Sequence, residues 1–314
     1  MMSIALSLAI GPYDHVRDLR PAGIDLVVLE LPVEEIFYRF THFREWHASE
    51  MSFGKVVSLM SAPKPDIVAL PVFPSRVFRH SAIYVQPGIT KPKDLEGKRV
   101  GIPEWAQTAG IYVRGLLQHE YGVDLAKVNW FQAGVREPGR VEKVKLDLPQ
   151  GVKIQAMPDR TLTDMFAKGE LDAVISARAV PGRRMFPDFP QLELEYFRKT
   201  RIFPIMHVVV LRRDVYERDR WIAMNLTQAF EEAKARGLAR LADIGASQVA
   251  VPWVPEYARR WREAIGEDLW PYGVEPNRPT LEAFFRYAHE QGVAKRRLSM
   301  EDVFAPETRE RAKI

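Results

Sequence analysis

The chain of 314 residues contains no cysteine. Without a thiol, it forms no disulfide bond and offers no thiolate ligand to a metal ion. Catalysis by a cysteine nucleophile and lipid attachment to an N-terminal cysteine are excluded for the same reason. Any acid, base or nucleophile in this protein therefore comes from other side chains.

Long apolar runs are missing as well. No segment approaches the roughly 20 apolar residues that a membrane-spanning helix requires. The N-terminal residues MMSIALSLAIGPYDH hold an apolar run that is too short to span a bilayer, with no basic residue before it and no clear cleavage site. We expect this run to form a first β-strand, and we expect a soluble, cytoplasmic protein with no membrane partner.

The common cofactor motifs are also absent. The chain has no phosphate-binding loop, no glycine-rich dinucleotide fingerprint and no nucleophile elbow, so we expect no organic cofactor. His42, His47 and Glu50 lie close in sequence and carry metal-ligand atoms. A break from strand to helix is expected between them, which would turn them to different sides, so we expect no metal site.

Neither sign of charge is in large excess. The chain has 45 Lys and Arg residues against 41 Asp and Glu residues, a formal net charge of +4, and the basic residues are scattered. This distribution does not fit a nucleic-acid-binding surface, but it permits a small anionic ligand. We therefore expect no nucleic-acid partner.

Short apolar strands alternate with helical segments along the whole chain, which is typical of α/β proteins. We expect strands at 4–9, 24–31 and 67–70, a helix that begins near Val33, and a further strand that ends near Ala48. Ser49 is then expected to cap a helix that runs through Met60, and a proline-rich crossing follows at 71–79. Strands at 80–85, 98–102, 128–131 and 173–176 and helices at 107–121 and 161–168 follow, with 134–152 as an exposed hairpin or excursion. The last expected elements are a strand at 202–213 and helices at 219–241, 256–265 and 280–291.

This order predicts two lobes, each a mixed sheet flanked by helices, joined by two hinge strands. Lobe 1 would hold residues 1–80 and 208–314, lobe 2 would hold residues 81–207, and a ligand cleft would lie between them. Ligands of open α/β sheets bind beyond the carboxyl ends of the strands. The candidate positions are therefore the turns and helix starts there and the hinge strands: Tyr13, Asp14, His15, Ser49, Glu50, His80, 104–108, Arg178 and His207.

The segment DLEGKRVGIPEWAQTAGIYVRGLLQHEYG at 94–122 reads as a strand, a turn and an amphipathic helix, with Thr108 as the expected cap. The first N–H groups of a helix are unpaired and carry partial positive charge. A carboxylate beside Gln107, Thr108 and Ala109 would be stabilised there. The alternative is an ordinary solvated helix start.

Several blocks carry a family resemblance that covers nearly the whole chain: SEMS at 49–52, PVFPSRVFRHSAIYV at 71–85, DLEGKRVGIPEWAQTAGIYVRG at 94–115, GELDAVISAR at 169–178, IFPIMHVVVLRRDVYE at 202–217, WPYGVEPNR at 270–278 and EDVFAPET at 301–308. In this order they resemble the 4,5-dihydroxyphthalate decarboxylase family, whose fold is similar to type II periplasmic solute-binding proteins. The resemblance implies a cofactor-independent carboxy-lyase that converts 4,5-dihydroxyphthalate to protocatechuate. In such a reaction an acid protonates the ring carbon that bears the carboxylate, and a hydroxyl group para or ortho to that carbon supplies electron density.

Within this implied chemistry, His207 is the expected acid, with His80 as the second histidine. Glu50 is expected to accept the phenolic proton, directly or through a histidine. A dicarboxylate requires cations, for which arginines near the hinge are suited. The expected substrate contacts are Tyr13, His15, Arg76, Arg79, Glu104, Trp105, Thr108 and Arg178.

Each of these residues also has a structural alternative. The arginines could pair with surface carboxylates, a histidine beside an apolar strand could be a structural group, and Trp105 could pack in the core. Glu50 and Glu104 could simply favour a helix dipole. His119 and His289 are expected on helix surfaces.

A second function remains open at this point. The same fold suits a non-catalytic solute-binding protein or sensor for an aromatic or other small carboxylate. The missing export signal and lipidation cysteine weigh against a transporter role. A metal-assisted decarboxylase would use a His-x-His pair, which the chain lacks. A homo-oligomer is compatible with the sequence.

Overall fold

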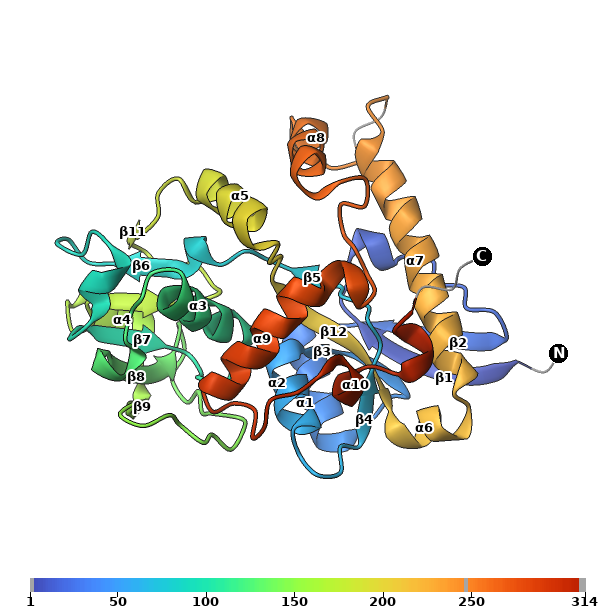
Figure 1. The fold of residues 1–314 in the computed structure, drawn as a ribbon, viewed down its shortest axis with the longest axis horizontal. Helices are drawn as coiled ribbons and strands as arrows, with labels where there is room; N and C mark the ends of the chain where they lie inside the picture. The colour runs from blue at the N-terminus through green and yellow to red at the C-terminus, as the bar shows by residue number, and fades with distance from the viewer. Residues whose placement is uncertain (1–2, 246–247, 311–314) are drawn as a thin grey trace.

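The strands of the protein form two separate sheets. The structure is a computed structural model and describes residues 3–245 and 248–310. Each sheet has six strands, and Figure 1 shows the two sheets on opposite sides of the molecule. The chain leaves the first sheet after β5 and returns to it with β12.

The first sheet, sheet A, has the strand order β2–β1–β3–β12–β4, and β5 also pairs with β12. Strand β1 is parallel to β2 and β3, whereas β12 is antiparallel to β3, β4 and β5. The strand bounds are β1 (Ile4–Ile10), β2 (Ile24–Glu30), β3 (Ala48–Ser52), β4 (Ile67–Ala69), β5 (Ser75–Arg76) and β12 (Ile205–Arg212).

The second sheet, sheet B, has the strand order β11–β6–β10–β7–β8–β9. Strands β10, β7, β8 and β9 are parallel to one another, whereas β6 is antiparallel to both of its neighbours, β10 and β11. The strand bounds are β6 (Ile83–Val85), β7 (Arg99–Ile102), β8 (Asn129–Gly134), β9 (Ile154–Thr161), β10 (Ala173–Ile175) and β11 (Arg183–Arg184).

Helices flank both sheets. The α-helices are α1 (Val33–Phe43), α2 (Phe53–Met60), α3 (Thr108–His119), α4 (Leu162–Ala167), α5 (Phe189–Thr200), α6 (Arg213–Arg218), α7 (Trp221–Ala242), α8 (Val254–Ile265), α9 (Arg278–Glu290) and α10 (Met300–Val303). Short 3₁₀ turns are η1 (Asp14–Val16), η2 (His80–Ala82), η3 (Pro92–Leu95), η4 (Leu125–Lys127), η5 (Glu275–Asn277) and η6 (Pro306–Thr308). Within the described ranges, no helix combines the length and apolar character needed to cross a bilayer.

Helix α9 lies between the two sheets in Figure 1 and packs on both sides. Its Phe284 stacks on Phe53 of α2, with ring centroids 4.6 Å apart, and contacts Tyr112 of α3 at 4.7 Å. Gly115 lets α3 and α9 approach closely, because a Cβ atom there would lie 2.2 Å from the ring of Tyr287. One apolar core therefore extends across both sheets, and a second, smaller apolar cluster, which includes Leu162, Met165 and Phe166, packs on sheet B.

The two-sheet α/β architecture was predicted correctly, but several local predictions were wrong. Ser49 does not start a helix: residues 48–52 form β3, which is buried between β1 and β12, and α2 begins at Phe53. A strand was expected to end near Ala48, but β3 runs from Ala48 to Ser52, and its pairing partners come from distant parts of the chain, which local pattern does not show. His80 likewise lies in turn η2 and precedes β6.

Residues 134–152 do not form a hairpin. Strands β8 and β9 on either side of this segment are parallel, so the segment is a crossover connection. Several elements were not predicted, and the two longest of them are β9 and α5. Strand β9 is an edge strand with polar residues and Pro158, which hide its pattern. Helix α5, at 189–200, was also missed.

Candidate active site

The carboxylate of Glu50 lies at the centre of sheet A and is completely buried. Strand β3 positions it: Glu50 lies opposite Val209 of β12, so His207, two residues away on β12, is its diagonal neighbour. The His207 Nδ1 atom lies 2.6 Å from Glu50 Oε1. The Tyr13 hydroxyl donates to the same oxygen at 2.7 Å, and the Gly11 N–H donates to Oε2 at 2.8 Å.

These contacts define the state of the His207 ring. A buried carboxylate is stable only when donors surround it, so we assign a proton to Nδ1 of His207. The other ring nitrogen, Nε2, has no hydrogen-bond partner among the described residues and is not one of their buried unpaired atoms, so it is open to solvent. The Glu50–His207 pair thus presents Nε2 as a group that can give or take a proton.

Tyr13 and Phe37 complete this centre. Burial, and then the negative charge of Glu50, raise the pKa of the Tyr13 hydroxyl well above its usual range, so Tyr13 stays a donor at neutral pH. The ring of Phe37 on α1 meets the His207 ring edge-on, with centroids 4.9 Å apart. The His207 side chain keeps 18% of its surface exposed. Phe37 and Gly11 were not predicted, because neither carries a chemical signal in the sequence.

His15 lies near this centre but is held by the backbone. Its Nε2 donates to the carbonyl of Pro74 at 3.0 Å, and its ring packs against Tyr13 and Trp270 at 5.6 and 5.2 Å. Burial lowers the pKa of His15, so the ring is neutral at pH 7. His15 supports the position of Tyr13 in this arrangement.

The structure places His80 and Arg79 in a separate group. His80 is 2% exposed, neither of its ring nitrogens has a hydrogen-bond partner among the described residues, and its Nδ1 lies 3.6 Å from Glu193. The guanidinium of Arg79 donates to the sulfur of Met206. Burial lowers the pKa of Arg79 to about 10, so it remains a cation at neutral pH.

Arg76 is buried and its donors are used inside the protein. Its Nη1 donates to the carbonyl of Phe203 at 2.9 Å, and its Nη2 donates to the carbonyl of Pro271 at 2.7 Å and to the side chain of Asn277. Burial lowers its pKa to about 9. Arg76 therefore joins β5 to the segment before α9, and we assign it no substrate contact.

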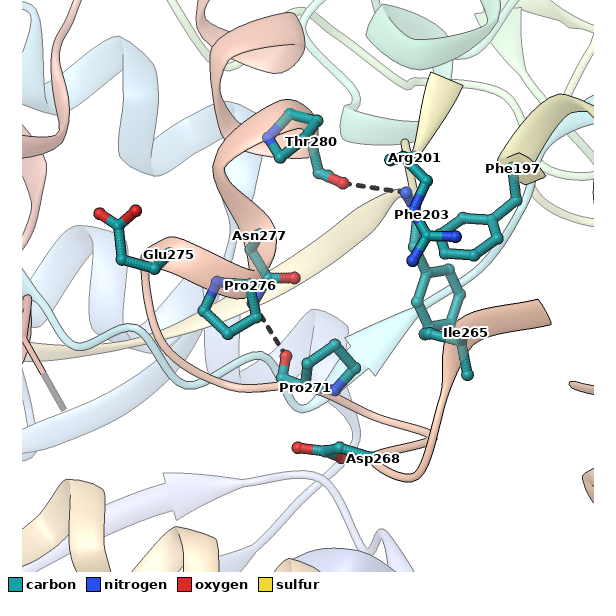
Figure 2. A pocket seen from close by; sticks show the side chains of 11 residues that line it. Phe197, Arg201, Phe203, Ile265, Asp268, Pro271, Glu275, Pro276, Asn277 and Thr280 are labelled. Atoms are coloured by element: carbon teal, nitrogen blue, oxygen red, sulfur yellow. Dashed lines mark hydrogen bonds between the residues drawn. The ribbon is translucent and has the colours of Figure 1, made fainter. Parts of the chain in front are cut away.

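A pocket of about 380 Å³ lies beside these contacts. Figure 2 shows its walls, in which the Phe203 N–H donates to Thr280 and the Asn277 side chain donates to Pro271. Its carboxylates, Asp268 and Glu275, are paired with Lys234 and Arg278. Glu50 and His207 are not among the residues that line this pocket.

The turn before α3 does hold a carboxylate, but the protein supplies it. The backbone N–H groups of Trp105 and Ala106 donate to Glu142 Oε2 at 2.7 and 3.2 Å. Burial raises the pKa of Glu142. Trp105 itself is fully buried, donates to the carbonyl of Gln291 and stacks on Arg114, so it does not cover a ligand ring in this structure.

Thr108 is not the cap of α3. Gln107 holds the cap position without a side-chain hydrogen bond, and Thr108 is the first helical residue. Its hydroxyl accepts the Gly54 N–H at 2.9 Å and contacts the Ser52 hydroxyl at 2.9 Å. Gly54 is required here, because a Cβ atom would lie 2.6 Å from the carbonyl of Ala106. Thr108 thus ties α3 to the start of α2.

Glu104 and Arg178 both bind charged groups. Glu104 accepts from Arg140 Nε at 2.6 Å, and Arg178 Nη2 donates to Glu34 at 2.7 Å. Arg140 and Glu34 were not predicted. Arg140 lies in the charged connection 134–152, whose composition predicted an exposed segment. Only the fold shows that Arg140 contacts Glu34 of α1.

The remaining histidines lie away from the pair. Nδ1 of His47 accepts from the backbone N–H and the hydroxyl of Ser7 at 3.0 and 2.8 Å. His119 and His289 are exposed on α3 and α9, as predicted. Across residues 3–245 and 248–310, no group of three His, Asp or Glu side chains is arranged to hold a metal ion. The metal-free site stays a prediction.

Comparisons with known proteins identify relatives of this chain. No family model matches it. It is 36% identical to a 4,5-dihydroxyphthalate decarboxylase of Comamonas testosteroni over 330 residues, with 100% of both chains covered. It is 38% identical to a Pseudomonas putida protein of the same name over 187 residues, which cover 57% of this chain and 72% of the relative.

Solved structures confirm the fold. The aliphatic sulphonate-binding protein SsuA of Escherichia coli matches with a TM-score of 0.50 and 12% identity, covering 97% of this chain and 98% of that one. The ligand-binding component of an ABC-type import system of Staphylococcus aureus, determined with zinc bound, matches with a TM-score of 0.50 and 9% identity, covering 96% and 97%. The fold is therefore of the periplasmic-binding-protein type. Because the full-length match to the Comamonas protein spans every element described above, the chain belongs to the 4,5-dihydroxyphthalate decarboxylase family.

Proposed function

We propose that this protein decarboxylates 4,5-dihydroxyphthalate to protocatechuate, with His207 as the acid that protonates the ring. The observation that carries the proposal is the hydrogen bond of 2.6 Å between Glu50 and His207 Nδ1, which leaves Nε2 open to solvent. A buried carboxylate that accepts from one nitrogen of an imidazole fixes the orientation of the ring and its tautomer. Both full- and part-length relatives carry this activity in their names.

The reaction needs a proton at one defined carbon. Removal of the proton from the 4-hydroxyl group pushes electron density to the para carbon, C1, which bears a carboxylate. His207 Nε2–H then delivers its proton to C1, and the C1–carboxylate bond breaks. CO₂ leaves, the electron pair of that bond returns to the ring, and solvent reprotonates His207 and the phenolate.

Glu50 acts through His207 in this scheme. The Glu50 carboxylate is completely buried and accepts from Gly11, Tyr13 and His207, so it cannot touch the substrate ring.

A turnover near 10 per second corresponds to a barrier of roughly 16 kcal/mol. One positioned acid supplies about 10² to 10⁴ in rate, so carboxylate binding and phenolate stabilisation must contribute as well. Arg79 is a partly buried cation that has no carboxylate in hydrogen-bond range among the described residues, so it is a candidate for phenolate or carboxylate binding.

The proposal includes the setting of the site. We treat residues 1–80 and 208–314 as lobe 1 and residues 81–207 as lobe 2, with the substrate between them. Support comes from the placement of β1–β5 and β12 in sheet A and of β6–β11 in sheet B. We also propose that the enzyme is cytoplasmic and has no nucleic-acid or membrane partner. Assembly into a homo-oligomer is compatible with this proposal.

Purified protein incubated with 4,5-dihydroxyphthalate tests this function. We expect equal amounts of CO₂ and protocatechuate, measured by a CO₂ electrode and by chromatography. Phthalate, which has no hydroxyl group to supply electron density, should bind and remain intact. Binding of 4,5-dihydroxyphthalate without any product would contradict the proposal and would favour a non-catalytic solute-binding protein instead. The names of the relatives do not favour that alternative.

A further inference from the structure

Two arginines from the sheet B side of the molecule meet one carboxylate from the sheet A side. Arg178, which follows β10, places Nη2 2.7 Å from Glu34 Oε1 on α1. Arg140, in the connection between β8 and β9, places Nη1 3.8 Å from the same oxygen. Because both guanidinium groups lie within 4 Å of a single oxygen atom, they are close enough to bind one carboxylate together.

This meeting point is linked to the proposed acid through helix α1, which carries both Glu34 and Phe37. Glu34 and Phe37 are three residues apart on α1, so their side chains lie on one face of the helix. Phe37 contacts the His207 ring with centroids 4.9 Å apart. One helical turn is about 5.4 Å, which is similar to the width of a substituted benzene ring. If C1 of the substrate ring lies at His207, the second carboxylate, on the adjacent carbon C2, would thus extend toward Arg140 and Arg178.

The charges around the two arginines favour an incoming carboxylate. Arg140 also binds Glu104 through Nε at 2.6 Å, and Lys143 lies 3.5 Å from the same Glu104 oxygen. The cations Arg140, Arg178 and Lys143 therefore outnumber the anions Glu34 and Glu104 by one. Glu34 and Arg178 are half-exposed, at 54% and 58%, so little free energy is lost when their pair opens.

We infer that Arg140 and Arg178 together bind the carboxylate of the substrate that is retained in the product, and that Glu34 occupies their guanidinium groups until substrate arrives. The inference rests on the proposed function and names the residues that select a dicarboxylate. A substrate carboxylate can replace Glu34 without leaving either guanidinium unpaired. Glu34 would then be a competitor built into the protein, so its charge would weaken binding.

Phthalate binding, measured by calorimetry at low salt, tests the inference without any turnover. Arg140→Met and Arg178→Met should each weaken phthalate binding about 10-fold or more, because each removes a charge-assisted hydrogen bond. Glu34→Gln should tighten phthalate binding several-fold, because the amide releases the two guanidinium groups. The double variant Arg140→Met/Arg178→Met should bind phthalate no better than benzoate, which carries a single carboxylate.

Arg160→Met is the matched control, because Arg160 is an exposed arginine of β9 that pairs with Glu170. It should bind phthalate as the parent does. Binding within twofold of the parent in both Arg140→Met and Arg178→Met would overturn the inference, and so would weaker binding in Glu34→Gln. Failure of the proposed function gives a different result, in which phthalate binds with this pattern but 4,5-dihydroxyphthalate yields no product.

Discussion

Replacement of Glu50 by glutamine tests how the buried carboxylate supports His207. The amide has nearly the same shape but only one acceptor oxygen, whereas Glu50 accepts from Gly11 at 2.8 Å, Tyr13 at 2.7 Å and His207 at 2.6 Å. The best placement keeps the oxygen toward Tyr13 and His207 and turns the NH₂ group toward the Gly11 N–H. One buried donor then loses its acceptor, and His207 loses its charged partner.

The contacts set the size of the effect. A hydrogen bond to a charged group contributes about 1.5–3 kcal/mol, which corresponds to about 10- to 150-fold in rate. We therefore expect Glu50→Gln to lower kcat by that factor and to leave phthalate affinity within threefold. The unpaired Gly11 N–H should also lower the free energy of unfolding by about 1–3 kcal/mol.

Initial rates of protocatechuate formation and urea unfolding curves measure the two effects. Glu307→Gln is a suitable control, because Glu307 also accepts a tyrosine hydroxyl, from Tyr216 at 2.7 Å. Its kcat should match that of the parent. A kcat for Glu50→Gln within twofold of the parent, with normal unfolding, would refute the reasoning that the carboxylate supports the acid.

Two further predictions concern stability. The Arg296 side chain, together with the Ser299 N–H, lowers the pKa of Asp302 from its unfolded value of 3.8 to about 2. The ionised Asp302 carboxylate therefore stabilises the folded state above about pH 4, and this contribution is lost as the pH falls through about 2. Asp302→Asn should therefore lower the free energy of unfolding by about 1 kcal/mol at pH 7, after allowance for solvent screening, and by less than half of that at pH 2. Urea unfolding at both pH values measures this difference, and an equal loss at the two pH values would disprove the prediction. Gly115→Ala should destabilise the protein by about 1–3 kcal/mol, because the new methyl group would meet the ring of Tyr287 at 2.2 Å. A melting temperature equal to that of the parent would show that α3 and α9 are not packed this closely.

The sequence allowed the fold class to be predicted and singled out His207 as a candidate, because both inferences depend on local pattern. The alternation of strands and helices indicates two α/β sheets, and His207 lies within the strongest apolar strand of the chain. Glu50 was also selected, but for an incorrect reason. It was expected at a helix start, whereas it lies inside β3, whose pairing with β1 and β12 depends on residues far along the chain.

The predicted ligand contacts depended on burial, which the sequence does not show. Arg76 and Trp105 carry suitable chemistry, but both are buried and held by backbone carbonyls. The turn at 104–108 does attract an anion, as the backbone chemistry predicts, and the anion is Glu142 from the crossover connection. Arg140 was missed because its partner Glu34 lies on α1, which is distant from it along the chain.

The turnover of His207→Asn tests the central claim most directly. The asparagine amide can keep the donor that faces Glu50 in place of Nδ1, which lies 2.6 Å from the carboxylate, but it has no counterpart of Nε2. We predict that kcat for 4,5-dihydroxyphthalate falls by about 10² to 10⁴ while phthalate affinity stays within threefold of the parent. A kcat within threefold of the parent would contradict the assignment of His207 as the acid that protonates the ring.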